Sequence, residues 1–319
     1  MNSLKTETQN DTPMDENKLN NRRILIYLLI NFGATWLYEF LVVWPVATST
    51  NPTVQSMSQL AVAVAMFFPA LSVVATRLIT KEGFKNAMLV PKNGKRSIPF
   101  FLMAWFGPAL LTVIGAVIYF VIFPKDFDPE MGAMAGLLAA QGLEPTKELV
   151  TVTVASQIIT GTLLSPLLNA INCFGEEWGW RGYLLPKLLK RMGILPMMLV
   201  SGVIWGLWHL PVTILGHNYG MGYLGYPVTG ILAMCLFCVV TGIIFSYLTI
   251  RTGSCLPAML AHGGLNGFAS AAILFTDGTS VNPFIGPIPT GIIGGSAFFL
   301  CAVIMAMLLV KKPGLENMP

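Results

Sequence analysis

Residues 98–123 read IPFFLMAWFGPALLTVIGAVIYFVIF, a run without a single charged side chain. A transmembrane helix needs roughly 20 consecutive and mostly apolar residues, so this run is long enough to cross a bilayer. The chain of 319 residues has the same bias throughout, with 54% hydrophobic and 11% charged residues. Soluble domains carry about 25% charged residues. The composition therefore predicts an all-α polytopic membrane protein.

Seven further apolar runs bring the predicted number of transmembrane helices to eight. A polar stretch over residues 1–23 precedes them and is predicted to be a disordered tail, followed by a single transmembrane domain over residues 24–311. The predicted spans cover residues 24–48, 58–79, 98–123, 150–173, 195–215, 227–250, 256–275 and 287–310.

The basic residues follow this arrangement of spans. The chain has 19 Lys and Arg residues, and all of them except Lys125 and Lys147 fall on one side of the eight spans. Because basic residues concentrate on the cytoplasmic side of membrane proteins, both termini are predicted to be cytoplasmic. The basic residues form no single patch, so no nucleic-acid partner is expected.

Ionisable and amide side chains interrupt four of the apolar runs. An ionisable group inside a span costs about 2.5–3.5 kcal/mol on insertion scales and by default marks a functional site. These residues are Glu39 in the first run, Glu176, Glu177 and Arg181 at the inner end of the fourth, His209 in the fifth, and His262 and Asn266 in the seventh.

Helical spacing sorts these polar residues into pairs. Glu177 and Arg181 are four residues apart, so they share a helix face and are expected to form a structural ion pair. Glu176 points about 100° away from Glu177 and faces something else. His262 and Asn266 are also four residues apart and point into one space.

The combination of residue types predicts activation of a water molecule. A carboxylate and an imidazole together can deprotonate water, and a second imidazole with an amide can stabilise an oxyanion. Two histidines and a carboxylate are also a catalytic zinc set. The sequence has no HExxH motif, and these residue types alone leave the metal-free and metal-dependent mechanisms both open.

Three short motifs now identify a family resemblance. EEWGWR (176–181) matches an EExxxR motif, WGLWH (205–209) resembles an FxxxH motif with Trp205 in place of phenylalanine, and HGGLN (262–266) matches an HxxxN motif. Together and in this order they resemble the CAAX-protease and bacteriocin-processing (CPBP) family of intramembrane endopeptidases, which includes the Ras-converting-enzyme type. The tryptophan is expected to keep the aromatic packing role and to change the shape of the cavity.

The resemblance implies a fold and a set of catalytic roles. It implies eight helices around a cavity open to the cytoplasm, with the motifs inside residues 150–275. Glu176 would be the general base and His209 its partner on the water. His262 and Asn266 would stabilise the oxyanion.

The resemblance also bears on the supporting residues and on metals. Glu177 and Arg181 would support the site. Enzymes of this family are described both as metalloproteases and as glutamate-dependent proteases without a metal. We expect no tightly bound cofactor; a divalent zinc ion, if one binds, would use Glu176, His209 and His262.

The predicted site requires a particular course of the fourth helix. Glu176 and His209 must come within about 8 Å of each other to share one water. The fourth run ends near residue 173, so its helix must continue past Glu177. Residues 184–193 would then form an amphipathic segment at the membrane surface.

The resemblance implies a peptide hydrolase in a bacterial-type plasma membrane. Its substrate would be a peptide or a membrane protein, with or without a lipid, such as a bacteriocin leader or a peptide pheromone. A non-catalytic immunity or scaffold protein that binds a peptide or protein partner is the main alternative. A transporter would require two related halves with broken helices, and no internal repeat supports this.

Overall fold

The computed structural model describes residues 13–278 and 281–318, which form helices and turns and include no strand. Residues 1–12 of the predicted tail lie outside the described part. The α-helices are α1 (Pro13–Tyr38), α2 (Trp44–Ala47), α3 (Pro52–Gln55), α4 (Ser58–Ala65), α5 (Phe68–Ile79), α6 (Ile98–Ile122), α7 (Gly132–Ala140), α8 (Lys147–Leu163), α9 (Ser165–Leu168), α10 (Ala170–Glu177), α11 (Leu185–Leu189), α12 (Ile194–Trp208), α13 (Leu210–Ile214), α14 (Val228–Thr252), α15 (Leu256–Phe268) and α16 (Ser296–Lys311). Two π-helical segments are η1 (Glu39–Val43) and η4 (Trp178–Leu184), and the 3₁₀ turns are η2 (Gly94–Ser97), η3 (Pro124–Asp126), η5 (Ala271–Phe275) and η6 (Leu315–Asn317).

Five helical segments of the described chain are long and apolar enough to cross a membrane, and α12 and α16 are shorter apolar helices. The five segments are Glu16–Ala47, Pro52–Ile79, Gly94–Ile122, Val228–Thr252 and Leu256–Phe275. The all-helical membrane fold is therefore confirmed. The number of eight spans and the cytoplasmic termini stay predictions.

The fourth predicted span is the one that the structure divides. Residues 150–173 fall on α8, α9 and α10, with breaks near Leu164 and Asn169. Pro166 lies in the first turn of α9, and because proline has no N–H it cannot continue the hydrogen bonding of α8. The break lets α10 take a new direction into the bundle.

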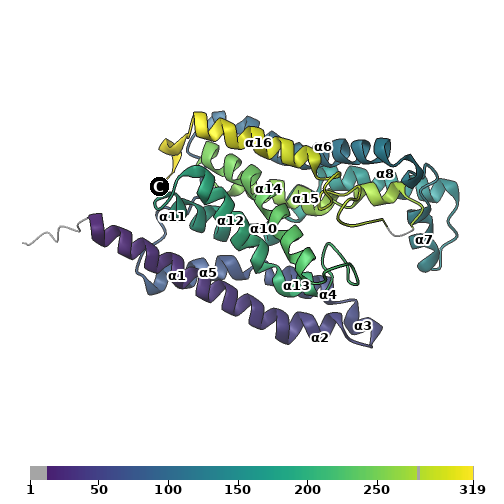
Figure 1. Cartoon of the computed structure of the whole chain (residues 1–319), viewed down its shortest axis with the longest axis horizontal. Coiled ribbons are helices and arrows are strands. Elements are labelled where there is room, and N and C mark those ends of the chain that lie inside the picture. The colour runs from purple at the N-terminus through teal and green to yellow at the C-terminus, as the bar shows by residue number, and fades with distance from the viewer. Residues whose placement is uncertain (1–12, 279–280, 319) are drawn as a thin grey trace, which may run out of the picture.

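The helices are arranged in three groups. In Figure 1, α1 and α5 run along one side and α6 and α16 along the other, with α10, α12, α14 and α15 between them. The start of α1 and the last described residues lie at the same end of the bundle (Figure 1), opposite α7. Helix α1 begins at Pro13, so part of the stretch predicted as a tail is helical.

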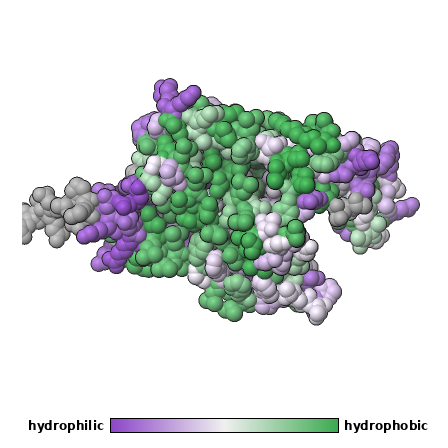
Figure 2. Space-filling model, viewed as in Figure 1, coloured by the Kyte–Doolittle hydropathy of each residue, from purple (hydrophilic) through white to green (hydrophobic). Residues whose placement is uncertain are grey.

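The surface of the bundle is apolar around its middle. Figure 2 shows a hydrophobic belt with hydrophilic residues at the two ends. Large apolar side chains such as Leu29, Leu41, Leu110 and Val121 are exposed within it. A soluble protein rarely exposes a continuous apolar surface of this extent, whereas lipid tails solvate it well. The belt is that of an integral membrane protein.

Small residues bring α12 and α14 into close contact. A Cβ atom at Gly202 would lie 2.5 Å from the Cα of Val239, and one at Gly206 would lie 2.5 Å from the Cα of Cys235. Gly202 and Gly206 are four residues apart, which is the spacing that lets two membrane helices approach backbone to backbone. This approach positions the C-terminal end of α12, where His209 follows.

A cluster of charged side chains around Glu82 links α1, α5 and α11 at the end of the bundle where α1 begins. This cluster of Glu82 with Arg23, Arg77 and Lys187 is called the latch. The carboxylate of Glu82 accepts hydrogen bonds from Lys187 and from the hydroxyl of Tyr183, and it lies 3.5 Å from Arg23 and 4.0 Å from Arg77. Burial alone would raise the pKa of Glu82. The hydrogen bond and charge of Lys187, with the charges of Arg77 and Arg23, nevertheless lower that pKa below its ordinary value.

We expect Gly206→Ala to destabilise the protein by about 1–3 kcal/mol, because an added methyl group would overlap the backbone of α14. Gly136→Ala is the matched control, since a Cβ at Gly136 meets nothing within 4 Å. The unfolding midpoint in detergent, measured for both variants, checks this. Equal midpoints for the two variants would contradict the close packing.

The latch makes a prediction about acid. A lowered carboxyl pKa contributes stability that is fully present above the unfolded-state pKa and is lost as the pH falls through the folded-state value. We therefore expect Glu82→Gln to melt below the wild type at pH 7. The difference in melting temperature should shrink as the pH falls below about 4. A difference independent of pH would count against the latch.

Candidate active site

The helical rod α10–η4–α11 carries the two glutamates into the interior. It continues past Glu177 through the wide turn of η4, as the sequence analysis required, and Glu176, Glu177 and Arg181 are 2%, 0% and 0% exposed. The rod stays buried through Leu184–Leu188. The prediction of a surface segment over residues 184–193 is therefore wrong for its first half, because these leucines pack in the core.

Glu177 is the meeting point of two helices. Its Oε1 accepts a hydrogen bond from Arg181 at 3.0 Å and another from Nδ1 of His262 at 2.9 Å. The pairing of Glu177 with Arg181 is confirmed. The bond to His262 was not predicted, and it joins the rod to α15. Since a carboxylate only accepts, Nδ1 of His262 carries the proton and Nε2 is left for another partner.

Glu176 faces away from that pair and towards α12. Its Oε2 accepts a hydrogen bond of 2.7 Å from the indole Nε1 of Trp205. The sequence analysis expected Trp205 only to pack as an aromatic ring. A phenylalanine, which the family motif has at this position, could not donate this bond, so the departure from the motif supplies Glu176 with a buried donor.

Trp205 also organises the residues around the two glutamates. The Arg181 guanidinium lies 4.2 Å from the centre of its ring, a distance at which a cation is attracted to the indole. The ring of His262 stands edge-on to it at 5.3 Å, and the ring of His209 lies 5.8 Å away. The three motifs therefore meet around this one indole.

The end of α12 explains the orientation of His209. The backbone N–H of His209 donates to the carbonyl oxygens of Gly206 and Leu207. The carbonyl of Trp205, which would accept this N–H in a regular α-helix, is therefore left without it. Nδ1 of His209 forms a hydrogen bond of 2.9 Å with this carbonyl oxygen. Helix α13 then begins at Leu210, with Pro211 in its first turn. Because a carbonyl only accepts, Nδ1 carries the proton in this arrangement and Nε2 is free to accept one.

Asn266 lies one turn along α15 from His262. Its amide faces Cys173 at 3.7 Å on α10, one turn before Glu176 and Glu177, and the residue is exposed. It therefore borders the cluster and does not enter the buried part of it.

Trp205 connects the predicted residues across helices. Glu176, His209 and His262 come from three helical segments, and each of them contacts Trp205. Among the described residues, Glu176 and His209 share no direct hydrogen bond; Trp205 contacts both of them. Their predicted separation of less than about 8 Å stays a prediction.

The side chains that were predicted to bind a zinc ion, if one binds, are Glu176, His209 and His262. Within the described residues, no three His, Cys, Asp or Glu side chains are grouped so that they could hold a metal ion.

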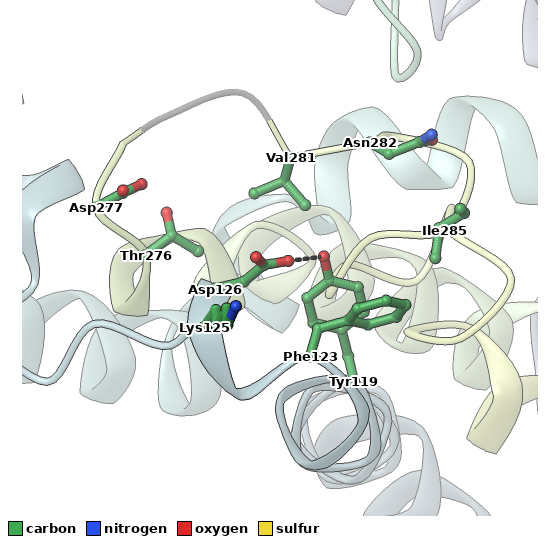
Figure 3. Close-up of a pocket in the computed structure, with 9 residues that line it drawn as sticks. All are labelled: Tyr119, Phe123, Lys125, Asp126, Thr276, Asp277, Val281, Asn282 and Ile285. Carbon is green, nitrogen blue, oxygen red and sulfur yellow. Dashed lines mark hydrogen bonds between the residues drawn. The ribbon is translucent and has the colours of Figure 1, made fainter.

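A polar pocket lies elsewhere in the bundle. It has a volume of about 230 Å³ and lies at the end of the bundle opposite the start of α1. The residues that line it include Tyr119, Lys125, Asp126 and Asn282. Figure 3 shows Tyr119 donating a hydrogen bond to Asp126 there. Two further pockets of about 210 and 490 Å³ have apolar linings. None of these three pockets includes Glu176 or the two motif histidines.

The segment that carries the cluster is similar to a known protein family. Residues 157–268 match the family model "Type II CAAX prenyl endopeptidase Rce1-like". This segment therefore resembles that family. The resemblance predicted from the three motifs is thereby confirmed for this part of the chain, and all seven motif positions, with Trp205 included, lie inside this Rce1-like segment.

One curated relative matches a stretch of this chain that is similar in length to the Rce1-like segment. It is CAAX prenyl protease 2 of Methanococcus maripaludis, 27% identical over 92 residues. The match covers 28% of this chain and 34% of the relative. Helices α1 and α5, which pack beside the Rce1-like segment, precede the residues that match the family model.

We expect Glu177→Gln to cost about 3–5 kcal/mol of stability, because it leaves the charge of Arg181 buried without its partner. The double variant Glu177→Gln with Arg181→Met removes both charges and should recover a large part of this loss. Unfolding midpoints of the two variants and the wild type test the pair. A single variant as stable as the wild type would contradict a charged buried pair.

Proposed function

We propose that the protein is an intramembrane endopeptidase that hydrolyses a peptide bond with a water molecule activated by Glu176 and His209. The observation that carries the proposal is the buried cluster of Glu176, Trp205, His209 and His262. A scaffold would gain nothing from carrying a carboxylate and two imidazoles into the interior at a cost of about 2.5–3.5 kcal/mol each. The Rce1-like segment supports the same reaction class.

The hydrogen bonds support a specific division of labour on the water. Glu176 accepts a proton from the water, and the resulting hydroxide attacks the carbonyl carbon of the scissile bond. Nε2 of His209, whose Nδ1 bonds to the Trp205 carbonyl, accepts a hydrogen bond from the remaining O–H of the same water. The proton held by Glu176 then passes to the leaving nitrogen as the C–N bond breaks.

The second imidazole suits the oxyanion. Nδ1 of His262 donates to Glu177, and in the imidazolium form the Nε2–H is a second donor that can point at the oxyanion. Asn266 on the same helix supplies a second donor. Two preorganised donors of this kind stabilise the negative charge that develops on the carbonyl oxygen. Glu177 and Arg181 act by holding His262 in place.

We propose that the substrate is a lipidated peptide or a membrane-protein segment, reached from the cytoplasmic side of a bacterial-type plasma membrane. The apolar belt suits a substrate that is held in the membrane by a lipid. Because Glu176 is 2% exposed, the helices around it must separate to admit a peptide bond. The Rce1-like segment favours a CAAX-type peptide as the first probe.

We expect Glu176→Gln to lower kcat by about 10²–10⁴-fold on a fluorogenic prenylated CAAX peptide, because loss of a general base costs about this much. Glu148→Gln is the control, since Glu148 is an exposed carboxylate on α8. Activity is measured with the full chain in liposomes. Equal rates for wild type and Glu176→Gln would refute the proposed base.

A second measurement separates the enzyme from the scaffold alternative. Peptide termini are compared in membranes from cells that make the wild type or Glu176→Gln at matched levels. Termini present only with the wild type establish proteolysis and identify substrates. Identical termini, together with a cellular phenotype that Glu176→Gln still rescues, would favour a scaffold.

A further inference from the structure

Helix α1 carries a buried polar stripe that faces the Rce1-like segment. Tyr27, Asn31, Thr35 and Glu39 are spaced by four residues, so they lie on one helix face, and their exposed fractions are 0%, 0%, 0% and 1%. Thr35 donates a hydrogen bond to Asn31 at 3.3 Å, and Asn31 donates one to the Tyr27 hydroxyl at 3.2 Å. Membrane helices bury such stripes against other polar groups and away from lipid.

Two hydrogen bonds attach this stripe to the residue before His209. The indole of Trp208 donates to the hydroxyl of Thr35 at 2.9 Å, and the indole of Trp36 donates to the carbonyl of Trp208 at 3.1 Å. Tyr27, at the other end of the stripe, packs against Trp180 and Tyr183 of η4, with ring centres 6.0 and 5.2 Å apart. Helix α1 therefore forms one wall of the candidate site.

Glu39 ends the stripe and has the least satisfied side chain on it. Its Oε2 is buried and has no hydrogen-bond partner among the described residues. The charge that acts on its carboxyl is that of Glu176, and among the described residues no Lys, Arg or His forms an ion pair with it. The π-helical segment η1 begins at Glu39, and such local π-turns occur frequently at functional sites.

These facts limit the chemical state of Glu39. A carboxylate buried without a cation or a donor is strongly disfavoured, so the neutral carboxyl is the form that this site accepts. A neutral carboxyl has one O–H donor. The carboxylate of Glu176 accepts a hydrogen bond from Trp205 at Oε2, and it can accept more.

We propose that Glu39 is a positioning residue for Glu176. Its neutral carboxyl donates a hydrogen bond, directly or through one water, to the Glu176 carboxylate and holds that carboxylate ionised and oriented towards the attacking water. Glu39 keeps its proton throughout the reaction and touches no substrate. The inference rests on the proposed function and adds to it a residue from outside the Rce1-like segment.

Two substitutions at Glu39 separate this role from a merely structural one. Glu39→Leu removes the donor, and we expect kcat on the prenylated CAAX peptide to fall about 10- to 100-fold with little change in KM, as for loss of a hydrogen bond to a charged group. Glu39→Gln keeps an N–H donor of similar reach and should stay within about threefold of the wild type. Glu148→Leu is the matched control and should resemble the wild type.

Other outcomes would overturn the proposal. Equal losses in Glu39→Leu and Glu39→Gln would mean that an ionised carboxyl is required. A lower melting temperature in Glu39→Leu with unchanged kcat would mean a structural role. A wild type that does not cleave the peptide would refute the proposed function for this probe, and a second measurement then decides the role of Glu39.

That second measurement is the infrared spectrum of the full chain at pH 7. A neutral buried carboxyl gives a C=O stretching band separate from those of carboxylates and amides. We expect this band in the wild type and in Glu148→Gln, and its loss in Glu39→Gln. Its absence from the wild type, or its persistence in Glu39→Gln, would overturn the proposal whatever the enzymatic result.

Discussion

One oxygen atom of Glu177 accepts hydrogen bonds from both Arg181 and His262 inside an apolar bundle. A charge cluster in this environment is tolerated only when its partners are held in place, since removing one of them leaves the others buried and unpaired. The bond to His262 fixes α15 against the rod α10–η4. The cation–π contact between Arg181 and Trp205 extends the same cluster to α12.

The backbone is shaped to let these side chains meet. Pro166 separates α9 from α8, so that α10 turns inward, and Pro211 lies in the first turn of α13, which begins directly after His209. Gly202 and Gly206 remove the side chains that would keep α12 and α14 apart. Lipid gives no hydrophobic drive for helices to associate, so close contact and internal hydrogen bonds must supply the attraction.

The opposite wall of the site comes from a part of the chain that precedes the Rce1-like segment. Helix α1 contributes a row of buried polar side chains that ends at Glu39, and two tryptophan bonds tie it to the end of α12. The latch around Glu82 holds the first turns of this helix against α5 and α11. The described site is thus assembled from the first, the middle and the last third of the chain.

The sequence by itself determined the membrane class, the order of the motifs and the Glu177–Arg181 pair, because hydropathy and a spacing of four residues are local properties. It also located Glu176, His209 and His262. It left Glu39 unassigned, missed the Trp205–Glu176 and Glu177–His262 bonds, and placed Leu184–Leu188 at the surface. Only the tertiary structure decided these points, because they depend on how helices far apart in the sequence cross and rotate. Residue types alone do not specify which face of each helix meets which neighbour.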